Sequence, residues 1–249
     1  MKVVVIIPAA GLGTRMAAAP SRGREPGPSK QFTELGGVPI LFHTLRRFVA
    51  SPAVQEICVA LRKNEISGFR SRLEKEAKDI LQKKVELVQG GEHRQHSVAN
   101  ALNAVHAAPG DMILVHDAVR PCVTGEIIES VIGAAQKYGA AIAGLPAVDT
   151  IKQVERTAGG AVITATIPRE RVVQAQTPQG FRYEVLKKAF DEANADGFVG
   201  TDEASLVERS GGEVQVVMGS PRNIKITTPA DMELAEFYLK TVARSWSHT

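Results

Sequence analysis

Short apolar runs and amphipathic stretches alternate along the first part of the chain. The first run, Val3 to Ile7, is short and continuous, which is typical of a strand buried on both faces. On this pattern we predict strands at residues 3–8, 56–61, 85–89, 112–116 and 141–146. Apolar residues at helical spacing between them predict helices at residues 40–50, 65–81, 95–107 and 125–138. The alternation predicts an α/β fold with a mainly parallel twisted sheet flanked by helices.

The alternation stops after residue 150. Two β-like pieces, residues 151–154 and 161–167, flank the turn Gly159-Gly160, which is typical of a hairpin. We therefore predict an arm that projects from the main sheet. Beyond the arm, helices are predicted at residues 183–193, 202–209 and 229–242, and strands at 214–218 and 223–226. Thr201 and Thr228 are the expected N-caps of the last two helices, and residues 17–29 are expected to form a mobile surface loop.

Composition narrows the function classes. The chain has 249 residues, of which 44% are hydrophobic and 23% charged, and this is ordinary for a globular protein. Its net charge of +3 comes without an extended basic stripe, so we expect no nucleic-acid partner. Cys58 and Cys122 do not make a disulfide framework, and Cys58 lies within a strand pattern, as a core residue does. No apolar run approaches the roughly 18 residues of a membrane span. We expect a cytoplasmic protein without a membrane segment.

The glycine-rich turn PAAGLGTRM, Pro8 to Met16, is the strongest single signal. It follows the first strand, and Gly11 and Gly13 permit a tight bend and close approach to a ligand. Arg15 adds a permanent cation, and this combination is typical of phosphate handling. Met16 replaces the third glycine of a dinucleotide fingerprint, and Thr14-Arg15 after Gly13 does not fit a Walker loop. The turn alone leaves nucleotide binding and a purely structural turn both open.

Two further segments follow predicted strands and carry polar groups. Asp117 and Arg120 stand at the carboxyl end of a strand, where open α/β sheets bind ligands. Asp117 suits Mg²⁺ carried by nucleotide phosphates, although a simple Asp117–Arg120 salt bridge is the alternative. Gly90 and Gly91 permit close backbone approach at the start of the next helix. His93 and His96 in the same segment lack partners for a metal site, so we expect them to face solvent.

The remaining polar candidates are ambiguous by themselves. Lys225 alternates with apolar neighbours, so it faces either solvent or a polar site. Asp202, Glu203 and Glu208 are expected on the solvated face of a helix. No pattern for a covalent nucleophile is present, since the sequence lacks a GxSxG elbow and a cysteine paired by motif with a histidine. The chemistry that these residues indicate is neutralisation of phosphate charge.

Eight motifs together resemble one family along nearly the whole chain. They are PAAGLGTRM, PSKQFTELGGVPIL, GGEHRQHSV, VHDAVRP, PAVDTIK, QTPQGF, TDEASLVE and NIKITTPADM. In these motifs and their order the sequence is similar to the 2-C-methyl-D-erythritol 4-phosphate cytidylyltransferases of the non-mevalonate isoprenoid pathway. The resemblance implies a Rossmann-like nucleotidyltransferase fold in one domain, residues 1–249, with a dimerisation arm at about 147–176. It also implies transfer of a cytidylyl group from CTP, a divalent cation such as Mg²⁺, and a homodimer.

The resemblance also assigns roles to individual residues. It implies that the catalytic cations are Arg15, Lys30 and Lys225. It implies that CTP is bound by Pro8, Ala9, Ala10, Gly11, Gly13, Gly91, Glu92, Ser97, Asp117 and Ala118, with Asp117 also near the metal. It implies that the sugar phosphate is bound by Arg120, Thr150, Arg169, Thr177 and Thr201. Thr150 and Arg169, on the arm, are expected to serve the site of the second subunit.

The chain departs from the family pattern at three points. The link between Arg15 and Lys30 is longer than usual, Ser29 stands where proline commonly precedes the lysine, and Val119 replaces a frequent alanine. The nearest alternative is a cytidylyltransferase for another polyol phosphate, such as ribitol 5-phosphate. A non-catalytic nucleotide-binding domain is a different class, but it is expected to lose Lys30, Asp117 or Lys225, and all three are present. Met16 disfavours an NAD-dependent dehydrogenase.

Overall fold

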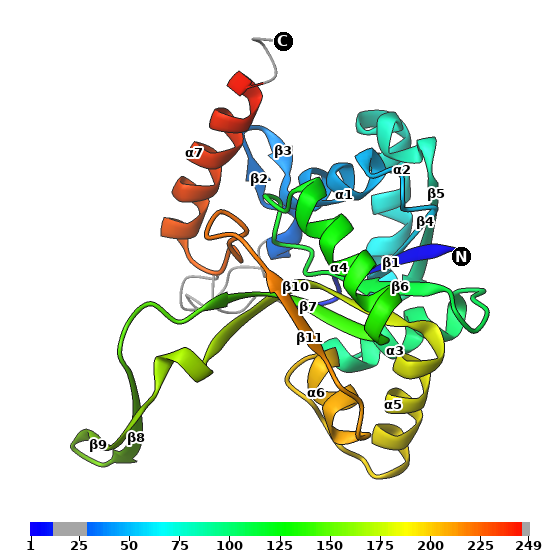
Figure 1. The fold of residues 1–249 in the computed structure, drawn as a ribbon. Helices are drawn as coiled ribbons and strands as arrows, with labels where there is room; N and C mark the ends of the chain where they lie inside the picture. The colour runs from blue at the N-terminus through cyan, green and yellow to red at the C-terminus, as the bar shows by residue number, and fades with distance from the viewer. Residues whose placement is uncertain (12–28, 246–249) are drawn as a thin grey trace.

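A seven-stranded sheet forms the centre of the protein (Figure 1). The computed structural model describes residues 1–11 and 29–245. The strand order is β11-β7-β10-β6-β1-β4-β5, and every neighbouring pair is parallel except those that involve β10. The strands are β1 (Val3–Pro8), β4 (Glu56–Leu61), β5 (Lys84–Gln89), β6 (Met112–Val115), β7 (Ala140–Pro146), β10 (Val173–Arg182) and β11 (Gln215–Met218). The predicted mainly parallel sheet is confirmed.

Helices cover both faces of this sheet, as the alternation predicted. Val3, Val5 and Ile7 of β1 join one core cluster, whereas Val4 and Ile6 join the other, because successive side chains of a strand point to opposite faces. The first face is covered by α1 (Ile40–Ala50), α2 (Ile66–Glu76) and α4 (Gly125–Tyr138). The second is covered by α3 (Arg94–Ala104), α5 (Tyr183–Ala195) and α6 (Glu203–Arg209). Cys58 is fully buried, as expected.

A small third cluster holds the carboxyl-terminal region. The helix α7 (Pro229–Ser245) lies at one end of the molecule beside β2 (Glu34–Leu35) and β3 (Val38–Pro39) (Figure 1). Leu35, Ile226 and Ala235 are completely buried together there. The Thr228 hydroxyl accepts a hydrogen bond from the Asp231 N–H at 3.3 Å, so the predicted cap is confirmed. Within residues 1–11 and 29–245, no helix is both long and apolar enough to cross a membrane.

The predicted arm is confirmed and extends well away from the sheet (Figure 1). It consists of the antiparallel strands β8 (Ile151–Thr157) and β9 (Gly160–Ile167), followed by the short 3-10 helix η4 (Arg169–Arg171). Gly160 has φ of 137°, a conformation that L side chains rarely adopt, which explains the glycine at this turn. The chain leaves the sheet at the end of β7 and returns into β10, so the arm is an insertion between two paired strands.

Three predicted elements differ from the structure. The helix at 65–81 is interrupted at Ala77 (φ −147°, ψ 45°), which separates α2 from the 3-10 helix η3 (Lys78–Gln82). This break lets Ala77 and Ile80 both enter the core. Residues 223–226 are not a strand; a turn at Asn223 and one bond from the Ile226 N–H to the Val119 carbonyl fix them instead. The first turn of α6 is capped by Asp202, not by Thr201, in a capping box with Ser205.

The antiparallel strand β10 was not predicted. Its sequence contains Pro178 and lacks a regular apolar alternation, which is why the pattern does not indicate a strand. In the structure, its register against β7 shifts between Ala175 and Gln179. The strand nevertheless lies in the middle of the sheet, between β6 and β7. It therefore brings Thr177 beside the end of β6, where the sequence places Asp117.

Candidate active site at the carboxyl edge of the sheet

A cavity of about 230 Å³ opens at the carboxyl ends of the parallel strands. Its walls come from the segments that follow β1, β5 and β6, from the short 3-10 helix η1 (Lys30–Phe32), and from the loop before α7. The lining residues are Pro8, Ala9, Ala10, Gly11, Lys30, Gln31, Gly91, Glu92, His93, Arg94, Ser97, Asp117, Ala118, Val119, Lys225 and Thr227. The edge of an open α/β sheet is where such proteins bind ligands.

Glycines let two backbone segments meet in this wall. A Cβ on Gly90 would lie 2.5 Å from the Ala10 Cβ and 2.9 Å from the Ser97 Oγ, so only glycine fits. The Ser97 Oγ accepts a hydrogen bond from the Gly91 N–H at 3.1 Å and fixes the loop against α3. Gly11 has no positive φ, and a Cβ there would meet no atom of the described residues within 4 Å. Gly90 thus allows the loop after β5 to pack against Ala10 and Ser97, whereas the described residues leave room beside Gly11 for a ligand to approach the backbone.

The helix η1 is joined directly to the turn after β1. The Gln31 Nε2 donates a 2.6 Å hydrogen bond to the Ala9 carbonyl, and both residues are buried. Lys30, the preceding residue, lines the cavity. The Gln31 bond therefore fixes the backbone that carries Lys30 relative to the glycine turn.

Three cationic side chains surround the carboxylate of Asp117. The Lys225 Nζ lies 2.9 Å and the Arg120 Nε 3.1 Å from its Oδ2, and the Arg94 Nε lies 3.4 Å from its Oδ1. Burial alone would raise the pKa of Asp117, but the charges of Arg94, Lys225 and Arg120 outweigh it and hold that pKa far below its usual range. Asp117 is therefore a permanent anion. The salt bridge with Arg120, given as the alternative interpretation of the sequence, exists, and its Asp117 lines the cavity while Arg120 lies behind it.

Arg94 connects this cluster to α6. Its Nη1 lies 2.6 and 2.8 Å from the two carboxylate oxygens of Glu203. Burial raises the pKa of Glu203 in spite of the opposing charge of Arg94. Glu203 was expected on a solvated face, which is wrong: its side chain is 1% exposed. The sequence could not reveal this, because the partner lies on α3, far away in the chain.

His116 ties the turn after β6 to β10. Its Nε2 lies 3.1 Å from the Arg120 carbonyl, which can only accept, so that nitrogen carries the proton. Its Nδ1 then accepts from the Thr177 hydroxyl, 3.1 Å away, whose oxygen accepts from the Asp117 N–H. Burial lowers the pKa of His116 to about 4, and its hydrogen bond to the Arg120 carbonyl opposes this. The neutral ring thus orients the Asp117–Arg120 turn.

Comparison with known proteins identifies the family. The family model described as IspD, 2-C-methyl-D-erythritol 4-phosphate cytidylyltransferase, matches residues 3–241. The protein of that name from Acidobacterium capsulatum is 60% identical over 240 residues, covering 96% of this chain and 98% of the relative. The one from Solibacter usitatus is 50% identical over 244 residues, covering 98% of each. The crystal structure of the Francisella tularensis protein, 35% identical, has a TM-score of 0.78 and covers 96% of this chain and all of that one.

This chain belongs to the 2-C-methyl-D-erythritol 4-phosphate cytidylyltransferase family. The resemblance inferred from the motifs is confirmed, and the chain is a nucleotidyltransferase. The cavity gathers most of the residues that the family resemblance assigned to CTP. Those that line it are Pro8, Ala9, Ala10, Gly11, Gly91, Glu92, Ser97, Asp117 and Ala118, and the predicted catalytic residues Lys30 and Lys225 line it as well. Gly13 and Arg15 lie outside the described residues.

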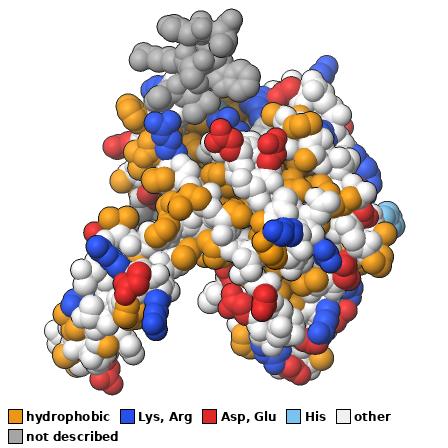
Figure 2. Space-filling view, in the orientation of Figure 1, with side chains coloured by type: hydrophobic (Ala, Val, Ile, Leu, Met, Phe, Trp, Pro, Cys, Tyr) orange, Lys and Arg blue, Asp and Glu red, His pale blue; other side chains and the backbone are white. Residues whose placement is uncertain are grey.

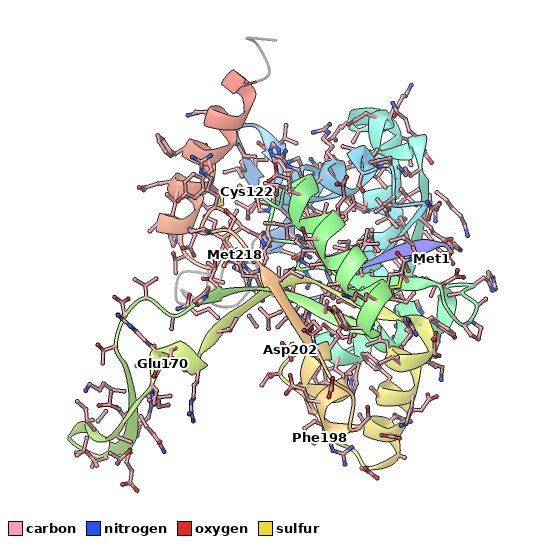
Figure 3. All side chains as sticks on the ribbon, viewed as in Figure 1. Met1, Cys122, Glu170, Phe198, Asp202 and Met218 are labelled. Atoms are coloured by element: carbon pink, nitrogen blue, oxygen red, sulfur yellow. The ribbon has the colours of Figure 1, made fainter. Side chains whose placement is uncertain are left out.

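The residues assigned to the sugar phosphate are more dispersed in this cytidylyltransferase. Arg120 and Thr177 are buried behind Asp117, whereas Thr150, Arg169 and Thr201 are exposed. The Arg169 Nη1 donates to the Val148 carbonyl at 2.7 Å, at the base of the arm. Figure 3 shows Glu170, the neighbour of Arg169, on the arm and far from Asp202, the neighbour of Thr201. Within one chain, the arm and the loop of Thr201 do not form a common site.

Sequence reasoning missed several residues of the cavity wall. They are Gln31, His93, Arg94, Val119 and Thr227. All lie inside or next to motifs already recognised, so proximity in sequence was the available signal. His93 and His96 are exposed, as expected. No group of three or more His, Cys, Asp or Glu residues within residues 1–11 and 29–245 is arranged to hold a metal ion.

Proposed function

We propose that this chain transfers the cytidylyl group of CTP to 2-C-methyl-D-erythritol 4-phosphate and releases pyrophosphate, as an enzyme of the non-mevalonate isoprenoid pathway. The family assignment supports this reaction. One observation supports the assignment of this reaction to particular residues: Lys30, Asp117 and Lys225 come from three separate segments and line one cavity. A nucleoside triphosphate and a sugar phosphate are both anions, and the two lysines supply the positive charge that their binding requires.

The cytosine is proposed to bind where the glycine turn meets the start of α3. Gly91, Glu92 and Ser97 line this end of the cavity with Ala10. Their backbone groups offer donors and acceptors for a polar ring, and the first turn of α3 leaves amide groups without partners within the helix. The ribose then lies near Asp117 and Ala118.

The chemical step requires charge neutralisation and alignment. An anionic phosphate oxygen of the acceptor attacks the α-phosphorus of CTP, a new P–O–P linkage forms, and pyrophosphate leaves with the electron pair of the broken bond. No general base is needed, since the attacking oxygen is already ionised near neutral pH. Lys30 and Lys225 are proposed to stabilise the crowded negative charge of the transition state. Arg15 is proposed to assist them, and Gly13 to approach the phosphates; both stay predictions from the sequence.

A divalent cation such as Mg²⁺ is proposed to enter with the triphosphate. The donor set fits an ion held mainly by phosphate oxygens and one carboxylate, since Asp117 borders the cavity. Three contacts with cationic side chains leave that carboxylate some acceptor capacity on Oδ1. When bound, the ion neutralises charge on the triphosphate. Asp117 would hold it, and Arg94 and Arg120 fix the position of Asp117.

The active assembly is proposed to be a homodimer joined through the arms. The arm exposes Val148, Val154, Val162 and Ile163, with exposed fractions between 47% and 79%. An isolated two-stranded hairpin is at best marginally stable in water, so these apolar side chains favour contact with another protein surface. The hydrophobic side chains in Figure 2 also gather on the body beside the base of the arm.

A second copy of the chain is the proposed cover for this region. Thr150 and Arg169 lie at the base of the arm, far from the Thr201 loop of their own subunit. Contact between two copies would place both residues near the partner's Arg120 and Thr177. These five residues are proposed to hold the sugar phosphate. A cytoplasmic location stays a prediction from the sequence.

The test is release of pyrophosphate from CTP in the presence of Mg²⁺, with two acceptors compared. We expect turnover with 2-C-methyl-D-erythritol 4-phosphate and none with ribitol 5-phosphate. Turnover with ribitol 5-phosphate alone would keep the cytidylyl transfer and overturn the acceptor. No release with either acceptor would overturn the proposed reaction. Omission of Mg²⁺ should abolish release, and unchanged turnover without it would overturn the proposed cation.

A further inference from the structure

Ser29 is buried and bonded, although the sequence placed it in a mobile surface loop. It is 4% exposed, and its Oγ donates a 2.7 Å hydrogen bond to the Glu65 Oε1. The same Oε1 accepts from the Arg62 Nη2 at 2.6 Å. Glu65 ends the 3-10 helix η2 (Lys63–Glu65), which follows β4. Ser29 is therefore attached to the neighbouring strand-to-helix connection, outside the cavity wall.

The Glu65–Arg62 pair is arranged around the serine. A carboxylate and a guanidinium commonly pair through two parallel bonds, but within residues 1–11 and 29–245 only one oxygen of this carboxylate, the Glu65 Oε1, accepts hydrogen bonds, from Ser29 and Arg62. The Glu65 Oε2 and the Arg62 Nε are both buried and have no hydrogen-bond partner within the described part of the chain. The geometry thus directs the Glu65 Oε1 to both Ser29 and Arg62, so the serine hydroxyl and the guanidinium share one carboxylate oxygen.

Lys30 lies between two such attachments. On its amino-terminal side Ser29 is bonded to Glu65, and on its carboxyl-terminal side Gln31 is bonded to the Ala9 carbonyl. A turn bond from the Phe32 N–H to the Ser29 carbonyl, 2.8 Å long, closes the short helix over Lys30. The ring of Phe32 also packs against Phe69 of α2. The backbone of Lys30 is thus fixed on both sides, while its side chain lines the cavity.

We propose that Ser29, Glu65 and Arg62 form a clamp that positions Lys30 for the transition state. The inference rests on the proposed catalytic role of Lys30. Ser29, Glu65 and Arg62 are positioning residues, because none of them lines the cavity. A displacement of a catalytic group by about 1 Å can lower a rate 100-fold, so the loss of one anchor should act mainly on kcat.

The backbone at Ser29 supplies a rescue experiment. Its φ of −54° and ψ of 140° lie in the range that proline adopts. The Ser29 N–H donates no hydrogen bond to any of residues 1–11 and 29–245, so a proline ring would remove no bond to them. Proline would restrict the backbone without restoring the hydroxyl. Ser29→Pro therefore separates a positioning role of the hydroxyl from any chemical role.

The experiment measures kcat, the KM for CTP and the thermal midpoint of four variants of the clamp and of one control variant. Ser29→Ala and Glu65→Ala should each lower kcat about tenfold, with KM changed less than about twofold and the midpoint by only a few degrees. The double variant should be no slower than either single variant, because both remove the same interaction. Ser29→Pro should return kcat to within about threefold of the parent. Ser67→Ala, at an exposed serine of α2, is the matched control and should leave kcat unchanged.

The outcomes distinguish this proposal from the one on which it rests. Lys30→Ala is measured in parallel; if its kcat is unchanged, Lys30 is not catalytic and both proposals fail. If Lys30→Ala is slow but Ser29→Ala matches the parent, the clamp alone is overturned. Ser29→Pro as slow as Ser29→Ala would also overturn it, because the hydroxyl would then not act through the backbone. A kcat loss that follows a fall in the thermal midpoint of 10 °C or more, as an order-of-magnitude threshold, would show general destabilisation instead.

Discussion

The cavity edge and the arm hold their predicted site residues in opposite ways. At the cavity, Asp117 is buried among three cations, and His116, Thr177 and Arg120 fix the turn that carries it. On the arm, Thr150 and Arg169 are exposed, and the neighbouring apolar side chains Val154, Val162 and Ile163 are exposed as well. The comparison teaches that contacts within one chain already fix the side chains of the cavity edge, whereas the exposed residues of the arm gain no comparable burial from the described residues of their own chain.

The largest expected effect comes from breaking the buried charge cluster. Asp117→Asn leaves Arg94, Arg120 and Lys225 without their shared anion, and we expect a loss of about 3–5 kcal/mol in the free energy of unfolding. On the arm, the Lys152 Nζ donates a hydrogen bond to the exposed Thr166 hydroxyl, and it forms no other within the described part of the chain. Lys152→Ala should therefore change stability by less than about 0.5 kcal/mol. Denaturant titrations of both variants test the contrast, and equal losses would contradict it.

The same cluster sets a pH dependence. The pKa of Asp117 is lower in the folded chain than in the unfolded chain, where it is about 3.9. Its contribution to stability is therefore complete above that pH and is lost as the pH falls towards the folded pKa. The stability gap between the parent and Asp117→Asn should narrow below about pH 4. A gap that is constant from pH 7 to pH 3 would contradict the ion-pair explanation.

The kcat of a Lys30 variant tests the proposed role of the cavity edge in the reaction. If Lys30 contacts the transferring phosphate in the transition state, Lys30→Ala should lower kcat about 100-fold or more, with a smaller change in KM. Lys188→Ala is the control, because Lys188 lies exposed on α5, away from the cavity. Pyrophosphate release measures both variants. A Lys30→Ala enzyme with parental kcat would remove Lys30 from the proposed mechanism.

Alanine substitutions of one glycine at the cavity and one on the arm compare how tightly the two regions are packed. Gly90→Ala would force a Cβ to within 2.5 Å of the Ala10 Cβ, and we expect a loss of about 1–3 kcal/mol together with a higher KM for CTP. Gly159 at the tip of the arm has nothing within 4 Å of the position of such a Cβ. Gly159→Ala should leave stability and KM nearly unchanged. Thermal unfolding and CTP titration measure both variants, and a greater loss at Gly159 would reverse the comparison.

The smallest effect is expected from a charge on the arm. Val154 and Ile163 are opposite each other in the hairpin register, and both are largely exposed. Val154→Glu should weaken dimerisation at least about tenfold, or ~1.4 kcal/mol, while leaving the unfolding of each subunit nearly unchanged. Sedimentation over a range of concentrations measures it, with Glu155→Gln as the control. A parent that is monomeric at all concentrations would contradict the proposed dimer.

Local sequence predicted the elements whose cause is local. The buried runs of β1, β4 and β6, the hairpin glycines and the Thr228 cap are read from neighbouring residues, and all are confirmed. The cavity followed from the rule that parallel strands end at a common edge. The choice between Thr201 and Asp202 as the cap of α6 was not decided by residue type, because both residues suit that position.

The remaining features depend on contacts between distant segments. Glu203 looks solvated in its own helix and is buried because Arg94 of α3 meets it. Strand β10 carries a proline and an irregular register, and it is a strand because β6 and β7 pair with it from both sides. Ser29 belongs to a Pro- and Gly-rich segment, yet it is buried and its hydroxyl donates a hydrogen bond to Glu65. No local pattern contains these partners.

The insertion point of the arm also bears on how such proteins diversify. Val173 is opposite Pro146, so β7 and β10 already close on each other where the arm begins. The entropic cost of closing a loop grows only with the logarithm of its length, so the stability of the sheet depends little on the length of the segment between these two residues. The arm can lengthen, shorten or change its surface without altering the register of the sheet. A change in the exposed apolar surface of the hairpin is therefore open to evolution, and to protein engineering, as long as the proposed substrate residues Thr150 and Arg169 at the base of the arm are kept.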